Sequence, residues 1–237
     1  MSADIYATID LGGTKIAGAL ARADGTIIVE KTIPTHSHLG PPGVAERMAA
    51  LVRDLAAQAG QQPRALGVGV PGLIDLAQGI VHFAPNLTTN WRGVPLRQWL
   101  EPQLGCPVAL LNDARMAALG ELTYGRARGV DTMVFVTIGT GVGGAVVVDG
   151  RLRLGPLGAA GVLGHQTIVA DGPVCGCGNR GCLEALASGP AIAASGVWLM
   201  QCGRAPRLYD LVEGDADRVT PGTMMQAAQA GDDSVKM

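Results

Sequence analysis

Aromatic side chains, clusters of basic charge and long apolar runs are all scarce in this sequence. Aromatic residues make up 3% of the 237 residues, whereas glycine occurs 35 times. This composition suits a fold with many tight turns and close approaches between backbone segments. Hydrophobic residues make up 48% of the chain, so a folded globular protein with one large domain or two ordinary ones is expected.

The lack of basic and apolar segments narrows the function classes. Lys and Arg total 18 against 20 acidic residues, which gives a formal net charge of -2. No segment has the basic density that a phosphate backbone requires, so we expect no nucleic-acid partner. No apolar run reaches the roughly 18 residues of a membrane helix, and Asp4 and Asp10 stand where a signal peptide would be basic and then apolar. We therefore expect a cytoplasmic protein with no membrane partner.

Glycine turns divide the chain into short strands and amphipathic helices. Residues 5–10, 16–22 and 26–33 indicate an antiparallel meander with turns at Gly12-Gly13 and Asp24-Gly25. Apolar spacing, turn residues and strand-like runs elsewhere predict further elements. These are strands at 65–70, 108–111, 133–138 and 144–148 and helices at 44–59, 96–104, 114–122 and from about 223 onward.

The opening pattern recurs in the second half of the chain. The strand 133–138 runs into the turn Gly139-Thr140-Gly141, and the next strand ends at a second turn, Asp149-Gly150. The repetition predicts an α/β fold of two similar halves with a ligand cleft between them. We place an N-terminal α/β domain at residues 1–115 and a second α/β domain at residues 116–237.

The two glycine turns are candidate phosphate loops. Gly12-Gly13-Thr14 and Gly139-Thr140-Gly141 have few side chains that would keep backbone N–H groups from an anion, and each offers a hydroxyl. Lys15 does not complete a Walker motif, and neither turn is a GxGxxG between a strand and a helix. Either turn taken alone is more readily an ordinary hairpin turn, whereas the pair, with Asp10 before the first turn, favours a nucleotide site.

Two aspartates stand beside these turns. Asp10 ends a strand and is suited to holding a magnesium-bound water beside a transferring phosphate, or alternatively to stabilising the turn. Asp113 follows a strand and opens a helix, which is compatible with a helix N-cap or with a general base for a hydroxyl nucleophile. Asn112 is placed to exchange hydrogen bonds with sugar hydroxyls.

His165, Cys175, Cys177 and Cys182 form an H-x9-C-x-C-x4-C array in a glycine-rich segment. Three thiolates and an imidazole are a complete tetrahedral zinc shell, and four protein ligands leave no open position, so the site would be structural. Disulfides are the alternative, but five cysteines leave one unpaired and a cytoplasmic chain favours metal. Cys106 and Cys202 are predicted to be small core residues.

These motifs together resemble the ROK family of sugar kinases and related repressors. Asp10-Leu11-Gly12-Gly13-Thr14-Lys15 is similar to its first phosphate motif, Gly139 to Gly144 to its second, and Asn112-Asp113 to its catalytic pair. The segment from Gly164-His165 through Cys175 to Glu184 resembles its zinc-bearing signature. The resemblance covers essentially the whole chain and implies an actin-like, hexokinase-type ATPase fold.

The resemblance also implies roles for individual residues. Asp113 would be the catalytic base, and ATP with Mg²⁺ would be the phosphoryl donor. The expected cofactor-binding residues are Asp10, Gly12, Gly13, Thr14, Lys15, Gly139, Thr140 and Gly141. The expected sugar-binding residues are Gly72, Asn86, Asn112, Asp113, His165 and Glu184. His165 would also ligate Zn²⁺, so that the metal holds the sugar-binding loop in place.

The sequence departs from the family pattern in two ways. Val162 stands three residues before His165, where many family kinases have a glutamate that bonds the sugar. Loss of one charge-assisted hydrogen bond would weaken sugar binding by roughly 1.5 to 3 kcal/mol, or mark a different substrate preference. Family members also continue past the position of Met237 with a glycine-rich adenosine loop and a returning helix, so we expect the C-terminal part to be truncated.

Several functions follow from the resemblance. The leading one is phosphorylation of a hexose at its 6-hydroxyl, with glucose first and N-acetylmannosamine or N-acetylglucosamine as alternatives. A non-catalytic sugar-binding regulator is less favoured, because such proteins carry an N-terminal helix-turn-helix and here the first strand begins at Ile5. A truncated, inactive remnant is the third possibility, and a homodimer is a possible assembly.

Overall fold

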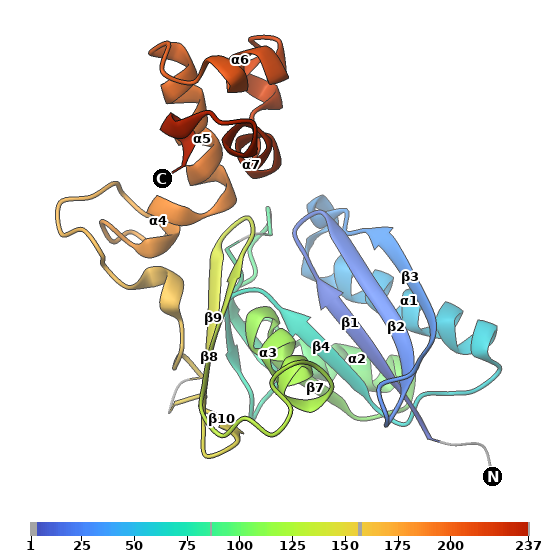
Figure 1. Cartoon of the computed structure of the whole chain (residues 1–237). Coiled ribbons are helices and arrows are strands. Elements are labelled where there is room, and N and C mark those ends of the chain that lie inside the picture. The colour runs from blue at the N-terminus through green and yellow to red at the C-terminus, as the bar shows by residue number, and fades with distance from the viewer. Residues whose placement is uncertain (1–3, 86, 156–157, 237) are drawn as a thin grey trace. The chain divides into compact units, whose positions relative to one another are not determined.

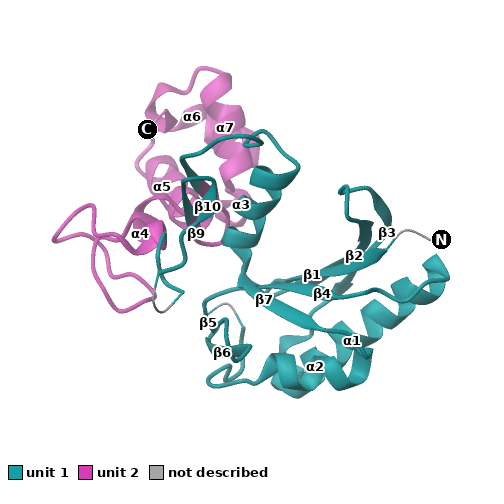
Figure 2. Ribbon diagram, turned by 90° about the horizontal axis from the view of Figure 1, so that it is seen from below, with its two compact units in different colours: residues 1–135, 145–161 teal, residues 136–144, 162–237 magenta. Residues whose placement is uncertain are grey.

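The computed structural model describes residues 4–85, 87–155 and 158–236, which form two compact units (Figure 2). Unit 1 comprises residues 1–135 and 145–161, and unit 2 comprises residues 136–144 and 162–237. The boundary predicted between residues 115 and 116 coincides with neither edge of these units. The predicted division into two similar domains between residues 115 and 116 stays a prediction.

The predicted elements occur in the predicted order (Figure 1). The structure adds short strands at 73–75, 80–83 and 151–152 and helices at 183–187, 189–201 and 206–212, which the sequence patterns did not predict. The strands are β1 (Ile5–Leu11), β2 (Lys15–Arg22), β3 (Ile27–Pro34), β4 (Leu66–Val70), β5 (Leu73–Asp75), β6 (Ile80–Phe83), β7 (Val108–Asn112), β8 (Met133–Ile138), β9 (Val142–Val148) and β10 (Arg151–Leu152). The α-helices are α1 (Gly40–Ala59), α2 (Leu96–Leu104), α3 (Asp113–Thr123), α4 (Leu183–Ala187), α5 (Gly189–Gln201), α6 (Pro206–Val212) and α7 (Pro221–Gln229). Short 3-10 helices lie at Ser37–Leu39, Leu163–His165, Ala216–Arg218 and Asp233–Val235.

Unit 1 is built on a five-stranded sheet in the order β3-β2-β1-β4-β7. The first three strands form the predicted antiparallel meander, while β4 runs parallel to β1 and β7 parallel to β4. Helices α1 and α2 lie on one side of the sheet and α3 on the other (Figure 2). The parallel strands β1, β4 and β7 therefore end at the same edge, where Asp10 and Asn112 are located.

The core of unit 1 lies between the sheet and helix α1. Alternate residues of β1, from Ile5 to Leu11, are buried, and they face apolar residues of α1 such as Met48 and Leu55. The helix begins at Gly40, four residues earlier than predicted, because Pro41 and Pro42 occupy its first turn, where a missing N–H costs nothing. This packing holds the sheet whose edge carries the candidate site.

Unit 2 has its own small core. Helices α5, α6 and α7 pack around Leu199, Leu208 and Met224, which are almost fully buried. Cys106 is buried in the core of unit 1 as predicted, but the core assignment of Cys202 is wrong, since this residue is exposed. Cys202 lies at the C-cap of α5, one position past the last helical residue, where its side chain faces solvent. No helix in the described part of the chain is both long and apolar enough to cross a membrane.

Candidate active site and metal centre

The first glycine turn joins β1 to β2 and is closed by backbone hydrogen bonds. The N–H of Gly12 donates to the carbonyl of Lys15 at 2.9 Å, and the side chains of Thr14 and Lys15 are exposed. Thr35, directly after β3, donates its N–H to Thr14 O at 2.9 Å and its hydroxyl to Gly12 O at 2.7 Å. The turn is thus held from a neighbouring strand by a residue that the sequence motifs did not single out.

Two carboxylates lie at the carboxyl edge of the parallel strands. Gly69 of β4 is paired with Asp10 of β1, and a Cβ at Gly69 would lie 3.6 Å from Asp10 Oδ1 and 3.6 Å from Asp113 Cα. A glycine between the two strands therefore leaves room for both acidic residues. The structure brings Asp10 and Asp113 close together at this edge, while their predicted roles stay predictions.

Both carboxylates have altered proton affinity. Burial raises the pKa of Asp10, and the Coulombic attraction of Lys15 partly opposes this shift. Burial also raises the pKa of Asp113, with the negative charge of Asp10 adding to the shift and the N–H of Ala114 opposing it. A raised pKa makes Asp113 a better proton acceptor than an ordinary carboxylate at a pH where it is ionised.

The junction between β7 and α3 fixes Asp113. The N-cap of α3 is Asn112, whose Oδ1 accepts the N–H of Arg115 at 3.3 Å, so Asp113 is the first helical residue and not the cap. Asp113 Oδ1 accepts the N–H of Ala114 at 2.7 Å. Asn112 Nδ2 donates to Gly72 O at 3.3 Å and so connects β7 to the turn after β4.

Gly72 occupies a turn that no other residue fits well. Its φ of 93° lies in the left-handed region, and a Cβ there would collide with the carbonyl of Phe83. The backbone conformation explains why glycine is found here, while its predicted sugar contact stays a prediction. The predicted sugar residue Asn86 lies outside the described residues.

Arg115 is a buried cation that the sequence motifs did not reveal. Its side chain is 3% exposed, and both Nε and Nη2 donate to Ala160 O, at 3.2 and 2.8 Å. Burial lowers the pKa of its guanidinium, while Asp113 favours the charged form. Arg115 thereby ties the start of α3 to the segment that leaves unit 1.

The four predicted metal ligands of unit 2 lie close together. The ligand atoms of His165, Cys175, Cys177 and Cys182 are all within 4.8 Å of one another. Cys177 Sγ and Cys182 Sγ are 3.8 Å apart, and Cys175 Sγ is 3.6 Å from His165 Nδ1. A tetrahedral zinc with Zn–S bonds near 2.3 Å requires sulfur atoms about 3.8 Å apart, so the donor set fits this metal. All five cysteines are free thiols, which disfavours the disulfide alternative.

The thiols of the cluster differ in acidity. Burial, together with the neighbouring Cys177 and Cys175, raises the pKa of Cys182 to about 12. The pKa of Cys177 is lowered, chiefly because the backbone N–H of Asn179 donates to it. A metal binds thiolates, so its binding would release the proton of Cys182 and depend on pH.

Glu184 links the metal cluster to the second glycine turn. Its Oε2 accepts the N–H of Val142 at 3.0 Å, and its Oε1 lies 3.9 Å from His165 Nδ1 and 3.8 Å from Cys175 Sγ. A Cβ on Gly141 would collide with this carboxylate. Any larger residue at position 141 would therefore displace the carboxylate of Glu184.

The second turn is closed by its own backbone. Gly139 N–H donates to Gly141 O at 2.9 Å, and Gly139 O accepts the N–H of Gly189 at 2.8 Å, which anchors the turn to the start of α5. With the Gly139 N–H already used, Thr140 and Gly141 are the candidate phosphate donors. The first turn lies in unit 1 and the second in unit 2, so their approach to one nucleotide stays a prediction.

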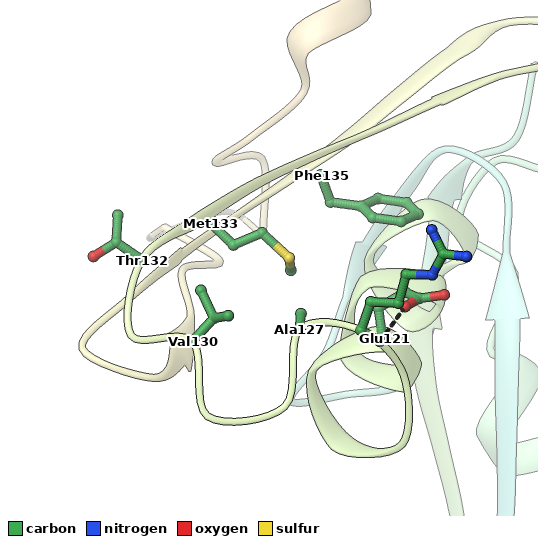
Figure 3. A pocket seen from close by; sticks show the side chains of 7 residues that line it. Glu121, Ala127, Val130, Thr132, Met133 and Phe135 are labelled. Carbon is green, nitrogen blue, oxygen red and sulfur yellow. Dashed lines mark hydrogen bonds between the residues drawn. The ribbon is translucent and has the colours of Figure 1, made fainter.

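A separate hollow of about 700 Å³ lies beside α3 and β8 in unit 1 (Figure 3). Figure 3 shows Met133, Val130 and Phe135 along it, with the carboxylate of Glu121 near one end. Glu121 accepts the N–H of Arg126 at 3.0 Å. None of the predicted site residues that the structure describes lines this hollow, so it is not assigned to the candidate site.

Comparison with known proteins identifies the class of the chain. The mixed α/β fold is of the actin-like ATPase type, and solved sugar kinases share it. A ROK-family glucokinase from Streptomyces griseus, in complex with glucose and AMPPNP, matches 98% of this chain and 73% of its own, with a TM-score of 0.81 and 34% identity. A ROK-family transcriptional regulator, a homolog of the E. coli MLC protein, matches 99% of this chain and 58% of its own, with a TM-score of 0.85 and 28% identity.

The family model described as ROK family matches residues 6–235, and the chain belongs to this family. It is 42% identical to a glucokinase of Thermotoga maritima over 184 residues, which cover 78% of this chain and 57% of that protein. It is also 42% identical to an N-acetylmannosamine kinase of Escherichia fergusonii over 187 residues, which cover 79% of this chain and 62% of that protein. The matched part thus spans less than two thirds of these relatives.

Proposed function

We propose that this chain transfers the γ-phosphoryl group of ATP to a hexose hydroxyl. The observation that carries the proposal is the environment of Asp113, which lies at the carboxyl edge of the sheet beside Asp10, is held through Oδ1 by the N–H of Ala114 and has a raised pKa. The relatives named glucokinase and the related structure with glucose and AMPPNP support the choice of donor and acceptor.

In the proposed reaction Asp113 accepts the proton of the 6-hydroxyl through Oδ2 as the oxygen attacks the γ-phosphorus. The bond between the γ-phosphorus and the bridging oxygen breaks, and ADP leaves with that oxygen. Asn112 would orient the sugar, Gly12–Lys15 would bind phosphate through backbone N–H groups, and Asp10 would hold a magnesium-bound water. Mg²⁺, when bound with ATP, supplies charge neutralisation for the phosphates.

We also propose zinc for the cluster of His165 and the three cysteines. His165 faces the thiols through Nδ1, which leaves Nε2 on the opposite side of the ring for a sugar hydroxyl. The role of the metal would be structural, because the four side chains complete its shell. Glu184 and His165 would then form the sugar-binding part of unit 2.

Glucose is the proposed substrate and N-acetylmannosamine the alternative, because relatives of both names share 38 to 42% identity with the chain. Val162, which is 40% exposed, stands where many family kinases have a sugar-binding glutamate, so the preference of this chain need not follow either relative. Assays with glucose, mannose and the two N-acetyl sugars would rank them by kcat/KM.

The kinase proposal is tested by sugar-dependent ADP release from the chain and from Asp113→Asn. We expect loss of at least about 100-fold in kcat in the variant, since general-base catalysis contributes roughly 10² to 10⁴. Asp54→Asn is the matched control, because Asp54 lies on α1 and is paired with Lys31 on the surface. Full activity in Asp113→Asn would remove Asp113 from the proposed role.

A sugar-binding regulator is the second candidate, favoured by the similarity to the ROK-family transcriptional regulator. Calorimetry with glucose and with MgATP separates the candidates. A kinase binds both and releases ADP, whereas a sensor binds sugar without turnover, and an inactive remnant binds no nucleotide. A homodimer also stays a prediction, to be measured by sedimentation.

A further inference from the structure

Thr35 is a buried polar residue at the base of the first glycine turn. Its relative exposure is 0%, and it makes two hydrogen bonds to that turn. The hydroxyl donates to Gly12 O at 2.7 Å, and the N–H donates to Thr14 O at 2.9 Å. One residue thus engages two carbonyl groups of the proposed phosphate loop.

The bond to Gly12 O determines the orientation of a whole peptide group. In a trans peptide the C=O of one residue and the N–H of the next point in opposite directions. Because Gly12 O points toward Thr35, the N–H of Gly13 points away from it. Gly12 and Gly13 both lack a Cβ, so little else in their own structure prevents this peptide from rotating.

Thr35 is itself held on both sides. Arg47 of α1 donates from Nε and Nη2 to Pro34 O, at 3.2 and 2.7 Å. On the other side, Ser37 Oγ lies 2.9 Å from Thr88 Oγ1, and Thr89 donates to Ser37 O at 3.2 Å. The segment that carries the Thr35 hydroxyl is therefore bonded to α1 and to residues 88–89 independently of the turn.

We infer that Thr35 is a positioning residue that locks the Gly12–Gly13 peptide with the Gly13 N–H directed at the phosphates of the bound nucleotide. The inference rests on the proposed nucleotide site. Thr35 does not touch the nucleotide in this account. It acts by holding the Gly13 N–H in the orientation that binding needs. The loop then loses less conformational entropy when the nucleotide binds.

The test compares Thr35→Val, which removes the hydroxyl but keeps the shape, with Thr35→Ser, which keeps the hydroxyl. We expect the Kd for MgATP to rise about 10-fold in the valine variant, since the partly buried carbonyl of Gly12 loses its donor, and to return to within about 2-fold of the original value in the serine variant. The KM for sugar should change by less than about 2-fold. Thr123→Val is the matched control, because Thr123 donates to Leu119 O at the same 2.7 Å within α3.

A second measurement works without a nucleotide. The ¹⁵N order parameters of Gly13 and Thr14 should fall in Thr35→Val and recover in Thr35→Ser, while those of β1 stay unchanged. Unchanged order of the turn in the valine variant, or equal loss of MgATP and sugar affinity, would overturn the inference. Failure of the unmodified chain to bind MgATP would instead reject the proposed nucleotide site, and the order parameters would still decide the role of Thr35.

Discussion

At the scale of residues, the two carboxylates beside Gly69 serve the proposed function but lower the stability of the fold. Asp10 and Asp113 flank this glycine, and burial raises the pKa of each carboxyl. The folded protein therefore holds these protons more tightly than the unfolded chain. A carboxyl group whose pKa is raised by folding makes the folded state less stable as the pH rises through its folded pKa. The proposed catalytic geometry is thus maintained at some expense of stability at neutral pH.

Asp113→Asn should be more stable than the unmodified protein at pH 7, and the difference should vanish near the ordinary carboxyl pKa of 3.8 and below. The reason is that asparagine keeps a hydrogen-bond acceptor for Ala114 without the charge. Urea denaturation at several pH values measures this.

Asp54→Asn is the control with the opposite sign. The Lys31 ammonium donates to Asp54 and lowers the pKa of that carboxyl. Its replacement should therefore reduce stability at pH 7 and have no effect at acidic pH. A pH-independent stability difference between Asp113→Asn and the unmodified protein would show that the ionisation of Asp113 is unperturbed by folding.

At the scale of elements, the turn between β4 and β5 decides how the sheet edge is shaped. Gly72 has a φ of 93°, its carbonyl accepts from Asn112, and the carbonyl of Phe83 occupies the space that a Cβ would need. The hairpin of β5 and β6 can therefore fold back closely against the strand that carries the site. Gly93 also has a positive φ, of 68°, but has nothing within 4 Å of its Cβ position.

Gly72→Ala should destabilise the protein by about 2–4 kcal/mol, because the left-handed conformation and the collision add together. Gly93→Ala should cost only about 1 kcal/mol, the strain of the backbone alone. Urea denaturation of the two variants separates the contributions. Equal costs for the two substitutions would mean that the turn relaxes around the added methyl group.

At the scale of the whole molecule, the described residues form two separate cores and one candidate metal-binding cluster. The larger core belongs to unit 1, and the smaller core is formed by helices of unit 2. The loop of residues 166–182 has few buried apolar side chains, and Ile168, Val169 and Val174 are exposed. A loop of this kind gains little from hydrophobic burial, so we expect the metal to supply much of its stability.

Removal of zinc by a chelator should lower the melting temperature of unit 2 by about 5 °C or more and leave the transition of unit 1 in place. Calorimetry before and after chelation, with metal content measured by mass spectrometry, provides the check. Cys182→Ser should lose the metal, whereas Cys202→Ser, which alters an exposed thiol outside the cluster, should retain one ion per chain. Stoichiometric zinc in Cys182→Ser would contradict the proposed ligand set.

The sequence alone determined the family and most of the elements of the first half of the chain, whereas helices α4, α5 and α6 were not predicted. Turn chemistry located the opening meander, helical spacing located α1 and α2, and the cysteine spacing identified the residues that the structure gathers into a candidate metal-binding cluster, because these signals act over a few residues. The family motifs at Asp10–Lys15 and Asn112-Asp113 also marked where two strands end. The exposed Cys202 was missed, because a position just past a helix end has no periodic pattern to predict its burial.

Only the tertiary structure revealed how these parts are held. Thr35 binds Gly12 across 23 positions of sequence, Arg115 binds Ala160 across 45, and Glu184 binds Val142 across 42. A threonine after a strand or an arginine in a helix carries no local signal of such a partner. These contacts depend on how strands pair and where loops return, so local propensity determines the elements while the assembled fold decides which polar groups meet.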